Sequence, residues 1–596
     1  MSGYRLPFCA APFQAEEPPL RLLSDEERNS FKASISDLKQ KRVVQECEDC
    51  SGQFLSSIFL VPKPDGSSRL ILNLKVLNTF LSVPHFRLED GRSVAKLMSP
   101  GVFMASLDLK DAYYLVPIHL AHRKFLRFRF DGILYEFLSL PFGLTSAPFV
   151  FTKLLKPVMS FLRLQGFVSV IYLDDVLLFG SSISSCSANI RSTIELFESL
   201  GFIINYAKSN LSPSRSCKYL GFIYDSTSMS IRLPSEKIGK ILSLIRSLSV
   251  GRQISIRDFA RLLGYLVSCC PAVRYGFAHT KIGERAKFLA LDANFGDFDR
   301  KMIISSEVME DLSWWQNVEF FADNPIRCRS FVLEIFSDAS LSGWGACCNG
   351  QRAGGPWMQE ESSFHINYLE LLAAFFGLRC FASELSDCQI LLRIDNTTAV
   401  TYINRMGGTH SVRLNDITQK IWQWCSVRNL WVFASYIASA DNSVADFESR
   451  RGADSGDISV SPEFFRSIVF RFGLPEVDLF ACRDSAKCRR YVSWKPDPGS
   501  WAIDAFSLCW SGTFFYAFPP VSVIAKVLQK IRSDGGRGIV LVPRWPAQPW
   551  YPVFRQLLES EPWSFRANEG LIFSSSEQST FWDKVTLEVG LLSGRL

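Results

Sequence analysis

Length, composition and charge exclude several kinds of protein before any motif is considered. The chain has 596 residues, of which 47% are hydrophobic and 21% charged, as is typical of globular rather than disordered proteins. The length predicts about four domains. The sequence has no uncharged apolar stretch of about 18 residues, the length needed to span a membrane. Residues 1–20 also contain no apolar signal-peptide core. We therefore expect an intracellular protein, in the cytoplasm, the nucleus or both, with no membrane partner.

Two apolar segments in the first half of the chain carry aspartates. Residues 103–118 read FMASLDLKDAYYLVPI and predict a strand ending at Asp108, and residues 167–180 read FVSVIYLDDVLLFG and predict a hairpin whose turn presents Asp174 and Asp175. Carboxylates beside buried strands are costly unless a cation neutralises them. The three aspartates can hold two Mg²⁺ ions about 4 Å apart, an arrangement suited to in-line phosphoryl transfer.

These segments and their neighbours resemble, in order, the motifs of reverse transcriptases. Residues 61–78 resemble the fingers strand pair that grips the incoming nucleotide, residues 140–151 the motif near nucleotide and template, and residues 219–222 the primer grip. The resemblance implies a right-hand polymerase with fingers, palm and thumb. It also implies Mg²⁺ or Mn²⁺ as cofactor, with an RNA template, a DNA primer and dNTPs as partners.

The resemblance assigns roles to individual residues of this sequence. Lys63 and Arg69 match the positions that contact the triphosphate, and Lys208 matches the lysine that protonates the pyrophosphate. Tyr113 stands where the family places an aromatic gate against the ribose 2′-hydroxyl, which implies a preference for deoxynucleotides. The other implied substrate contacts are Leu109, Asp111, Ala112, Phe142, Leu220 and Gly221.

Positive charge is concentrated in residues 201–300, which contain 15 basic and 7 acidic residues, whereas the whole chain has a formal net charge of only +6. Apolar periodicity predicts one helix capped by Ser235 and a second starting at Ser255, with Asp258 in a capping-box-like position. A surface that follows nucleic-acid phosphates and an ordinary solvated basic face both fit this pattern. The reverse transcriptase resemblance places the thumb here.

Four acidic residues in the second half resemble the catalytic set of RNase H. Asp338 lies on a predicted strand, Glu370 near the start of a helix, Asp395 at the end of an apolar strand and Asp446 in the segment DNSVADFESRR. The resemblance implies that they hold two Mg²⁺ ions around a scissile phosphate of an RNA–DNA hybrid.

One position departs from the RNase H pattern. The family has a histidine in the loop before the last aspartate, where this chain has Tyr436 followed by Ile437-Ala-Ser-Ala-Asp441. Because that histidine is thought to help product release, we expect slower hybrid cleavage with metal binding retained.

The C-terminal region alternates predicted strands, at residues 513–518 and 538–542, with a helix at residues 521–531. It resembles phage-type adenine-N6 methyltransferases in Asp478-Leu-Phe-Ala481 and at several later positions. Its loop Phe518-Pro-Pro-Val521 lacks the amide and the aromatic ring with which such enzymes bind the target base. We expect a degenerate or structural domain, with active methylation as the alternative. Four tryptophans either stack on nucleic acid or pack in the core: Trp494, Trp501, Trp545 and Trp550.

The order of these regions resembles the polyprotein of DIRS-type retrotransposons, which integrate through a tyrosine recombinase. No recombinase motif occurs in the chain, so that partner would be encoded separately.

The sequence thus predicts a multidomain α+β and α/β protein that copies RNA into DNA and degrades the template. Two other hypotheses are a decayed or domesticated copy that binds nucleic acid without catalysis, and a DNA methyltransferase with accessory domains. The expected divisions are an N-terminal extension (1–41), fingers and palm (42–230), thumb and connection helices (231–329), an RNase H-like α/β domain (330–452), a linker (453–470) and a methyltransferase-like α/β domain (471–596).

Overall fold

The computed structural model describes residues 3–19, 23–62, 68–318, 320, 322–327, 330–451, 458–566, 571–574, 582 and 585–594. The chain forms two compact units. The first comprises Met1–Lys240, Pro271–Arg274 and Glu319–Cys328, and the second comprises Ile241–Cys270, Tyr275–Val318 and Arg329–Leu596. Among the helices so described, none is long and apolar enough to cross a bilayer.

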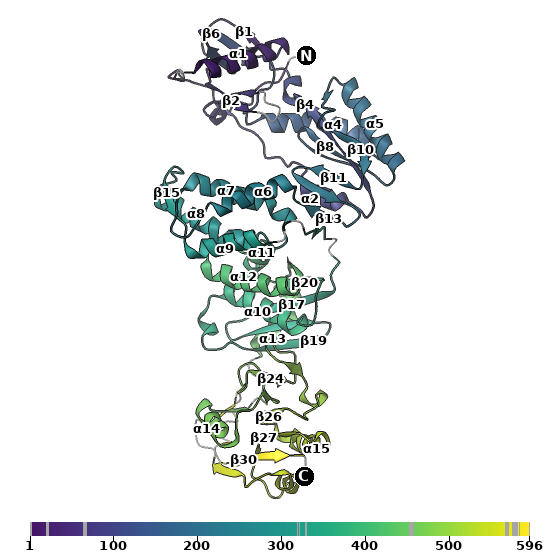
Figure 1. The fold of residues 1–596 in the computed structure, drawn as a ribbon, viewed down its shortest axis with the longest axis vertical. Helices are drawn as coiled ribbons and strands as arrows, with labels where there is room; N and C mark the ends of the chain where they lie inside the picture. The colour runs from purple at the N-terminus through teal and green to yellow at the C-terminus, as the bar shows by residue number, and fades with distance from the viewer. Residues whose placement is uncertain are drawn as a thin grey trace. The chain divides into compact units, whose positions relative to one another are not determined.

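The first unit contains an antiparallel sheet in the order β10-β4-β8-β7, with β9 also paired to β4 (Figure 1). Side chains of helices α4 and α5 pack with those of β4 and β8 in one hydrophobic core. The bounds are β4 (Phe103–Lys110), α4 (Ala147–Leu164), β7 (Ser169–Tyr172), β8 (Asp175–Gly180), α5 (Ile183–Ser199), β9 (Ile203–Ile204) and β10 (Asn210–Ser214).

The same core extends to the N-terminal elements. Helix α1 (Asp25–Gln40) starts with a capping box between Ser24 and Glu27 and buries Phe31, Ile35 and Leu38. The predicted N-terminal extension is therefore part of the packing of this unit rather than an appendage. The neighbouring elements are β1 (Val44–Glu46), β2 (Ile58–Pro62), β3 (Ser68–Leu72), α2 (Gly91–Leu97), α3 (Leu120–Arg123), β5 (Arg127–Phe130) and β6 (Ile133–Phe137).

A second small sheet follows, in the order β11-β12-β13-β16. Its strands are β11 (Ser216–Tyr219), β12 (Phe222–Asp225), β13 (Ser230–Arg232) and β16 (Asn324–Pro325). Helix α6 (Ser235–Arg246) begins at Ser235 itself, so this serine lies inside the helix rather than capping it.

The second unit begins with a helical group. Helix α7 (Ile256–Cys269) has the predicted cap, in which Ser255 accepts from the Asp258 amide and donates to its carboxylate. Its buried face comprises Ile256, Phe259, Leu262, Leu263, Leu266 and Cys269. The remaining elements are β14 (Gln253–Ser255), α8 (Lys281–Ala293), β15 (Lys301–Ile303) and α9 (Ser306–Asn317).

Next comes a five-stranded sheet in the order β19-β18-β17-β20-β21, with β20 and β21 parallel to β17. Apolar residues of α10, α11 and α12 pack with this sheet, and α13 contacts β18. The bounds are β17 (Leu333–Ala339), β18 (Gly343–Cys348), β19 (Gln351–Pro356), α10 (Ile366–Phe381), β20 (Gln389–Ile394), α11 (Thr397–Asn404), α12 (Val412–Val427), β21 (Trp431–Tyr436) and α13 (Ser443–Arg450).

The C-terminal sheet has the order β25-β24-β23-β26-β27-β30-β28, and β30 runs antiparallel to both of its neighbours. The strands are β23 (Val477–Asp478), β24 (Arg490–Ser493), β25 (Ala502–Ile503), β26 (Phe514–Ala517), β27 (Arg537–Pro543), β28 (Trp563–Arg566) and β30 (Thr586–Ser593), with helices α15 (Ile524–Asp534) and α16 (Tyr551–Leu557). A separate two-stranded antiparallel pair consists of β22 (Ile458–Val460), which precedes β23 in the chain, and β29 (Ile572–Ser574), which lies between β28 and β30.

The predicted linker is too long. Residues 462–470 belong to helix α14 (Pro462–Phe472), which Ser461 caps. Phe464, Phe465 and Ile468 of this helix are buried against the C-terminal sheet. Because apolar residues recur along the segment at helical spacing, burial rather than a flexible connection is the physical outcome. Residues 452–457 of the predicted linker lie outside the described residues.

Candidate active sites

The first site lies at the turn between β7 and β8. Tyr172 pairs with Asp175 across this hairpin, and Leu173 adopts a left-handed conformation with φ of 55°, as a two-residue turn requires. In the neighbouring strand β4, Asp108 pairs with Asp175. The structure thus brings Asp108, Asp174 and Asp175 to one end of the sheet, as the sequence predicted.

Hydrogen bonds fix Asp108 and its strand. The Asn205 side-chain amide donates to Asp108 Oδ1 at 2.7 Å, and the Asp108 backbone amide donates to Ser209 Oγ at 3.0 Å. The Leu109 amide donates to the Asp174 carbonyl at 2.9 Å. Sequence reasoning missed Asn205, because only its tertiary contact with Asp108 gives this residue a role.

The electrostatics of this turn favour a bound cation. Partial burial, followed by the charges of Asp174 and Asp108, raises the pKa of Asp175 to about 6, and Lys208 acts in the opposite direction. Lys208 itself is exposed. A divalent cation held by the three carboxylates would offset their mutual repulsion.

An aromatic cluster lies next to these carboxylates. The Tyr113 ring is 5.1 Å from that of Phe142 and 5.4 Å from that of Phe151, and the Arg69 guanidinium lies 4.3 Å from the Phe142 ring centre. Burial and the nearby Asp174 charge raise the pKa of Tyr113 to about 12, so its hydroxyl stays protonated.

The other predicted substrate contacts are distributed around this cluster. Leu109 and Ala112 are buried. The Asp111 carboxylate pairs with Lys41 at 3.0 Å, which leaves its backbone rather than its side chain for a ligand. Leu220 and Gly221 form the turn between β11 and β12. Lys63 lies outside the described residues.

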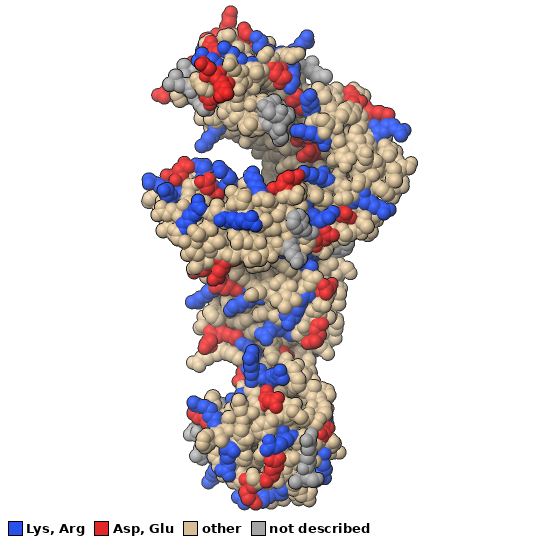
Figure 2. All heavy atoms as spheres, viewed as in Figure 1, with Lys and Arg blue, Asp and Glu red and all other residues tan. Residues whose placement is uncertain are grey.

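The predicted basic thumb carries both signs of charge. Arg257 pairs with Asp299, Arg261 with Asp258 and Arg300 with Asp297, and all of these side chains are largely exposed. Figure 2 shows blue and red atoms together over α7 and α8. These three aspartates are among the seven acidic residues already counted in residues 201–300, so the ion pairs occupy three of the fifteen basic residues and leave the net positive charge of the segment unchanged.

The second site lies in the sheet that has β17 at its centre. Asp338 of β17, Glu370 of α10 and Asp395 just after β20 each offer a carboxylate oxygen, and these oxygens lie within 4.8 Å of one another. Asp338 and Glu370 are each only 4% exposed. Among the described residues, this is the one group of three or more potential ligands that is gathered so closely.

Glu370 shows that the group fits a cation. Its Oε2 atom is buried without a hydrogen-bond partner within the described part of the chain. Burial, followed by the charges of Asp338 and Asp395, raises its pKa to about 9. An unpaired buried carboxylate is destabilising, and a divalent cation would supply the missing partner.

Asp446, the fourth predicted member, is held apart from this trio. Its Oδ1 atom accepts from Arg450 Nε at 2.8 Å and pairs with the second guanidinium nitrogen at 2.7 Å. Two serines that sequence reasoning missed orient the other carboxylates: Ser449 donates to Asp338 Oδ2 and Ser439 to Asp395 Oδ2, each at 2.6 Å. Tyr436, at the end of β21, is 54% exposed.

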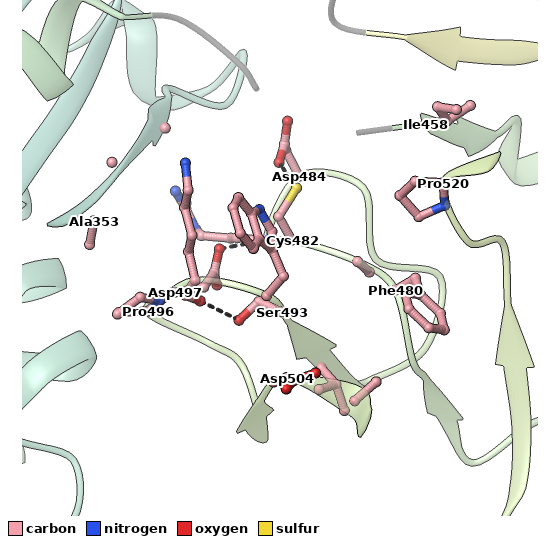
Figure 3. A pocket seen from close by; sticks show the side chains of 18 of the residues that line it. Ala353, Ile458, Phe480, Cys482, Asp484, Ser493, Pro496, Asp497, Asp504 and Pro520 are labelled. Carbon is pink, nitrogen blue, oxygen red and sulfur yellow. Dashed lines mark hydrogen bonds between the residues drawn. The ribbon is translucent and has the colours of Figure 1, made fainter. Parts of the chain in front are cut away.

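A cavity of about 590 Å³ lies at the carboxyl ends of β23, β24 and β26 (Figure 3). Two acidic residues of this region, Asp478 and Asp497, accept hydrogen bonds that fix the neighbouring loops. Asp478 accepts from the amides of Phe480 and Lys487, and burial nevertheless raises its pKa to about 6. Asp497 accepts from the Arg483 amide and the Tyr491 hydroxyl.

The four tryptophans of this region divide into two pairs. Trp550 is 8% exposed and Trp545 packs partly against the same core. Trp494 and Trp501 are 72% and 52% exposed. Core packing therefore accounts for the first pair and leaves the second available to a ligand.

Comparison with known proteins gives a match over the first site. Residues 61–224 match the family described as reverse transcriptase (RNA-dependent DNA polymerase). The chain is 21% identical over 457 residues to an enzymatic polyprotein of Cassava vein mosaic virus, covering 74% of this chain and 67% of that protein. It is 25% identical over 223 residues to the transposon Tf2-3 polyprotein of Schizosaccharomyces pombe, covering 37% of this chain but only 15% of the polyprotein.

Similar solved structures include the foamy viral protease-reverse transcriptase in complex with dsDNA and with an RNA/DNA hybrid. Each is 16% identical with a TM-score of 0.46; the first match covers 74% of this chain and 89% of that chain, the second 73% and 57%. The family match, together with the polyprotein relatives, identifies residues 61–224 as a reverse transcriptase domain of the retroelement type.

Proposed function

We propose that the chain is an RNA-directed DNA polymerase. The convergence of Asp108, Asp174 and Asp175 at the β7–β8 turn, inside the matched reverse transcriptase domain, carries this proposal. These carboxylates would hold Mg²⁺ or Mn²⁺, which supplies charge stabilisation and activation of the primer 3′-hydroxyl. Asn205 keeps Asp108 oriented, and Tyr113 limits the space beside the nucleotide sugar. Arg69 and Lys208 would neutralise the triphosphate and the leaving pyrophosphate.

Primer extension on an RNA template tests the polymerase. We expect dNTP incorporation by the wild-type chain and none by the Asp174→Asn/Asp175→Asn variant, which should still bind template. The variant leaves the basic residues intact, and its binding should weaken steeply with salt. Equal extension by both proteins would refute the proposal and favour a decayed or domesticated copy that only binds nucleic acid.

We propose a second activity, hydrolysis of the RNA strand of an RNA–DNA hybrid. The buried Glu370 carboxylate beside Asp338 and Asp395 carries it, because its Oε2 atom has no hydrogen-bond partner among the described residues and a bound cation would stabilise the charged form of this group. Asp446 would complete a two-metal set after leaving Arg450. Cleavage of a labelled hybrid in Mg²⁺, absent from Glu370→Gln, tests this proposal. An intact hybrid with an active polymerase would overturn it.

For the C-terminal domain we propose a methyltransferase-like fold without methyl transfer. The strand order, with the antiparallel β30 inserted between β27 and β28, supports the fold. The loop Phe518-Pro-Pro-Val521 supports the loss of activity. Transfer of a labelled methyl group from S-adenosylmethionine to DNA would contradict this view.

The combination of domains fits a DIRS-type retrotransposon polyprotein. In that setting the partners would be element RNA, a DNA primer, the hybrid formed between them and a recombinase encoded elsewhere.

A further inference from the structure

Arg483 connects the C-terminal domain to helix α10 of the preceding domain. It lies in the loop after β23, and its guanidinium pairs with Glu361, just before α10. The same guanidinium lies 4.3 Å from the centre of the Phe376 ring on α10. Both side chains of the ion pair are mostly buried, at 20% and 15% exposed. The interaction is therefore shielded from solvent, unlike most surface ion pairs.

Phe376 and the backbone of Arg483 are both held in place. Phe376 is 3% exposed and packs against the rings of Trp344 and Trp357. The Arg483 backbone amide donates to Asp497 Oδ2 at 3.1 Å, and Asp497 also accepts from the Tyr491 hydroxyl. A displacement of the Arg483 loop would thus be transmitted to α10 instead of being absorbed by a mobile side chain.

A second α10 residue faces the same loops. Burial lowers the pKa of the half-buried Arg379, the nearby Arg483 charge acts in the same direction, and the Asp497 charge acts in the opposite direction. Arg379 of α10 and Arg483 of the C-terminal domain therefore both interact electrostatically with Asp497.

The helices at this junction carry candidate nuclease carboxylates. Helix α10 bears Glu370, six residues before Phe376. Helix α13 bears Asp446 and Ser449, which donates to Asp338, while Glu448 and Arg451 line the cavity shared with the C-terminal domain. Three of the four carboxylates thus depend on elements that touch this domain.

We infer that the C-terminal domain positions the nuclease carboxylates, with Arg483 as the positioning residue that couples it to α10. The inference rests on the proposed hybrid cleavage, and it gives the domain a role that needs no methyl transfer. Charge and planarity both matter, because the guanidinium must pair with Glu361 and stack on Phe376 at once.

The experiment uses the full chain and the variants Arg483→Ala, Arg483→Lys and Arg466→Ala. Arg466 pairs with Glu463 on the exposed face of α14 and provides a matched control for the loss of an arginine. We expect Arg483→Ala to lower kcat for hybrid cleavage about tenfold and to raise the Mg²⁺ concentration needed for half-maximal cleavage, since small displacements at a metal site have effects of this size. KM for the hybrid and primer extension should not change, and Arg483→Lys should be intermediate.

Hydrogen–deuterium exchange gives a readout that does not depend on activity. We expect faster exchange in α10 and α13 of Arg483→Ala and no change in Arg466→Ala. The reversed pair Arg483→Glu/Glu361→Arg should recover only in part, because it restores the ion pair but not the contact between a guanidinium at position 483 and Phe376. If the wild type fails to cleave hybrids, the nuclease proposal fails, while faster exchange would still support the coupling. Unchanged exchange together with unchanged Mg²⁺ dependence would overturn the inference.

Discussion

Both carboxylate sites bring acidic side chains close together, but different surroundings offset the repulsion between them. At the β7–β8 turn, Asp174 is exposed, and Lys208 and the Asn205 amide moderate the repulsion. In the nuclease-like site, the buried Oε2 atom of Glu370 has no such donor among the residues that the structure describes. Solvent and these donors reduce the repulsion in the first cluster, although burial still raises the pKa of Asp175 to about 6, whereas the second cluster must take up a proton or a cation. The two sites should therefore respond differently to pH, to metal and to mutation.

The largest effect is expected where a carboxylate would ligate the metal directly. Asp175→Asn should reduce primer extension by about 10³-fold or more, because several kcal/mol of charge stabilisation would be lost. Hybrid cleavage by the same protein should not change. Gel assays of both activities on one preparation measure the contrast, and Asp131→Asn serves as a distant control. A parallel loss of both activities would point to misfolding instead.

Metal-free stability should distinguish the sites by its pH dependence. The pKa of Glu370 is raised from 4.5 to about 9, so the folded state binds this proton more tightly than the unfolded state. The protonated carboxyl therefore adds to the free energy of unfolding at low pH, and this contribution is lost as pH rises towards 9. The free energy of unfolding should fall by at most about 1.4 kcal/mol per pH unit. Thermal melts in chelator should show a falling Tm from pH 5 to 9.

Glu370→Gln and added Mg²⁺ should each flatten that dependence. The amide cannot ionise, and bound Mg²⁺ would stabilise the charged carboxylate. A wild-type melting profile that is independent of pH in chelator would contradict the assignment of Glu370 as the unpaired buried group.

The residues that orient one carboxylate in each site allow a direct comparison. Asn205→Ala and Ser449→Ala each remove a donor to an aspartate, at Asp108 and Asp338 respectively. We expect about a tenfold loss of primer extension in the first and of hybrid cleavage in the second. Burial raises the pKa of Asp338 and the Ser449 bond lowers it, so Ser449→Ala should also move the pH profile of cleavage upward. Asn205→Ala should leave that profile unchanged.

The sequence predicted the carboxylates more fully than the groups that support them. Asp108 and Asp175 lie in strongly apolar strand segments, so a local pattern marks each of them as a charged position in a mostly buried strand. Asn205, Ser439 and Ser449 are polar residues of ordinary type, and only the tertiary contact gives them a role. The sequence predicts a linker over most of helix α14 because the Ser, Gly and Asp residues that precede the helix obscure the apolar face formed by Phe464, Phe465 and Ile468. The contact of Arg483 with Glu361 spans 122 residues, a separation at which no local pattern operates.

The smallest expected effect concerns Arg450, which competes with a metal ion for the Asp446 carboxylate. Among the described ion pairs, no arginine or lysine competes in this way for a carboxylate of the polymerase site. Arg450 is 67% exposed and its pair with Asp446 is an i,i+4 contact, so its net contribution is about 0.2–1 kcal/mol. A metal that recruits Asp446 must first displace this guanidinium. Arg450→Ala should therefore lower the Mg²⁺ concentration for half-maximal hybrid cleavage by up to about fivefold, with little change in kcat at saturating metal. Mg²⁺ titrations of hybrid cleavage at two salt concentrations check this, since salt should narrow the difference in Mg²⁺ requirement between variant and wild type. A higher Mg²⁺ requirement in the variant would instead assign Arg450 to substrate binding.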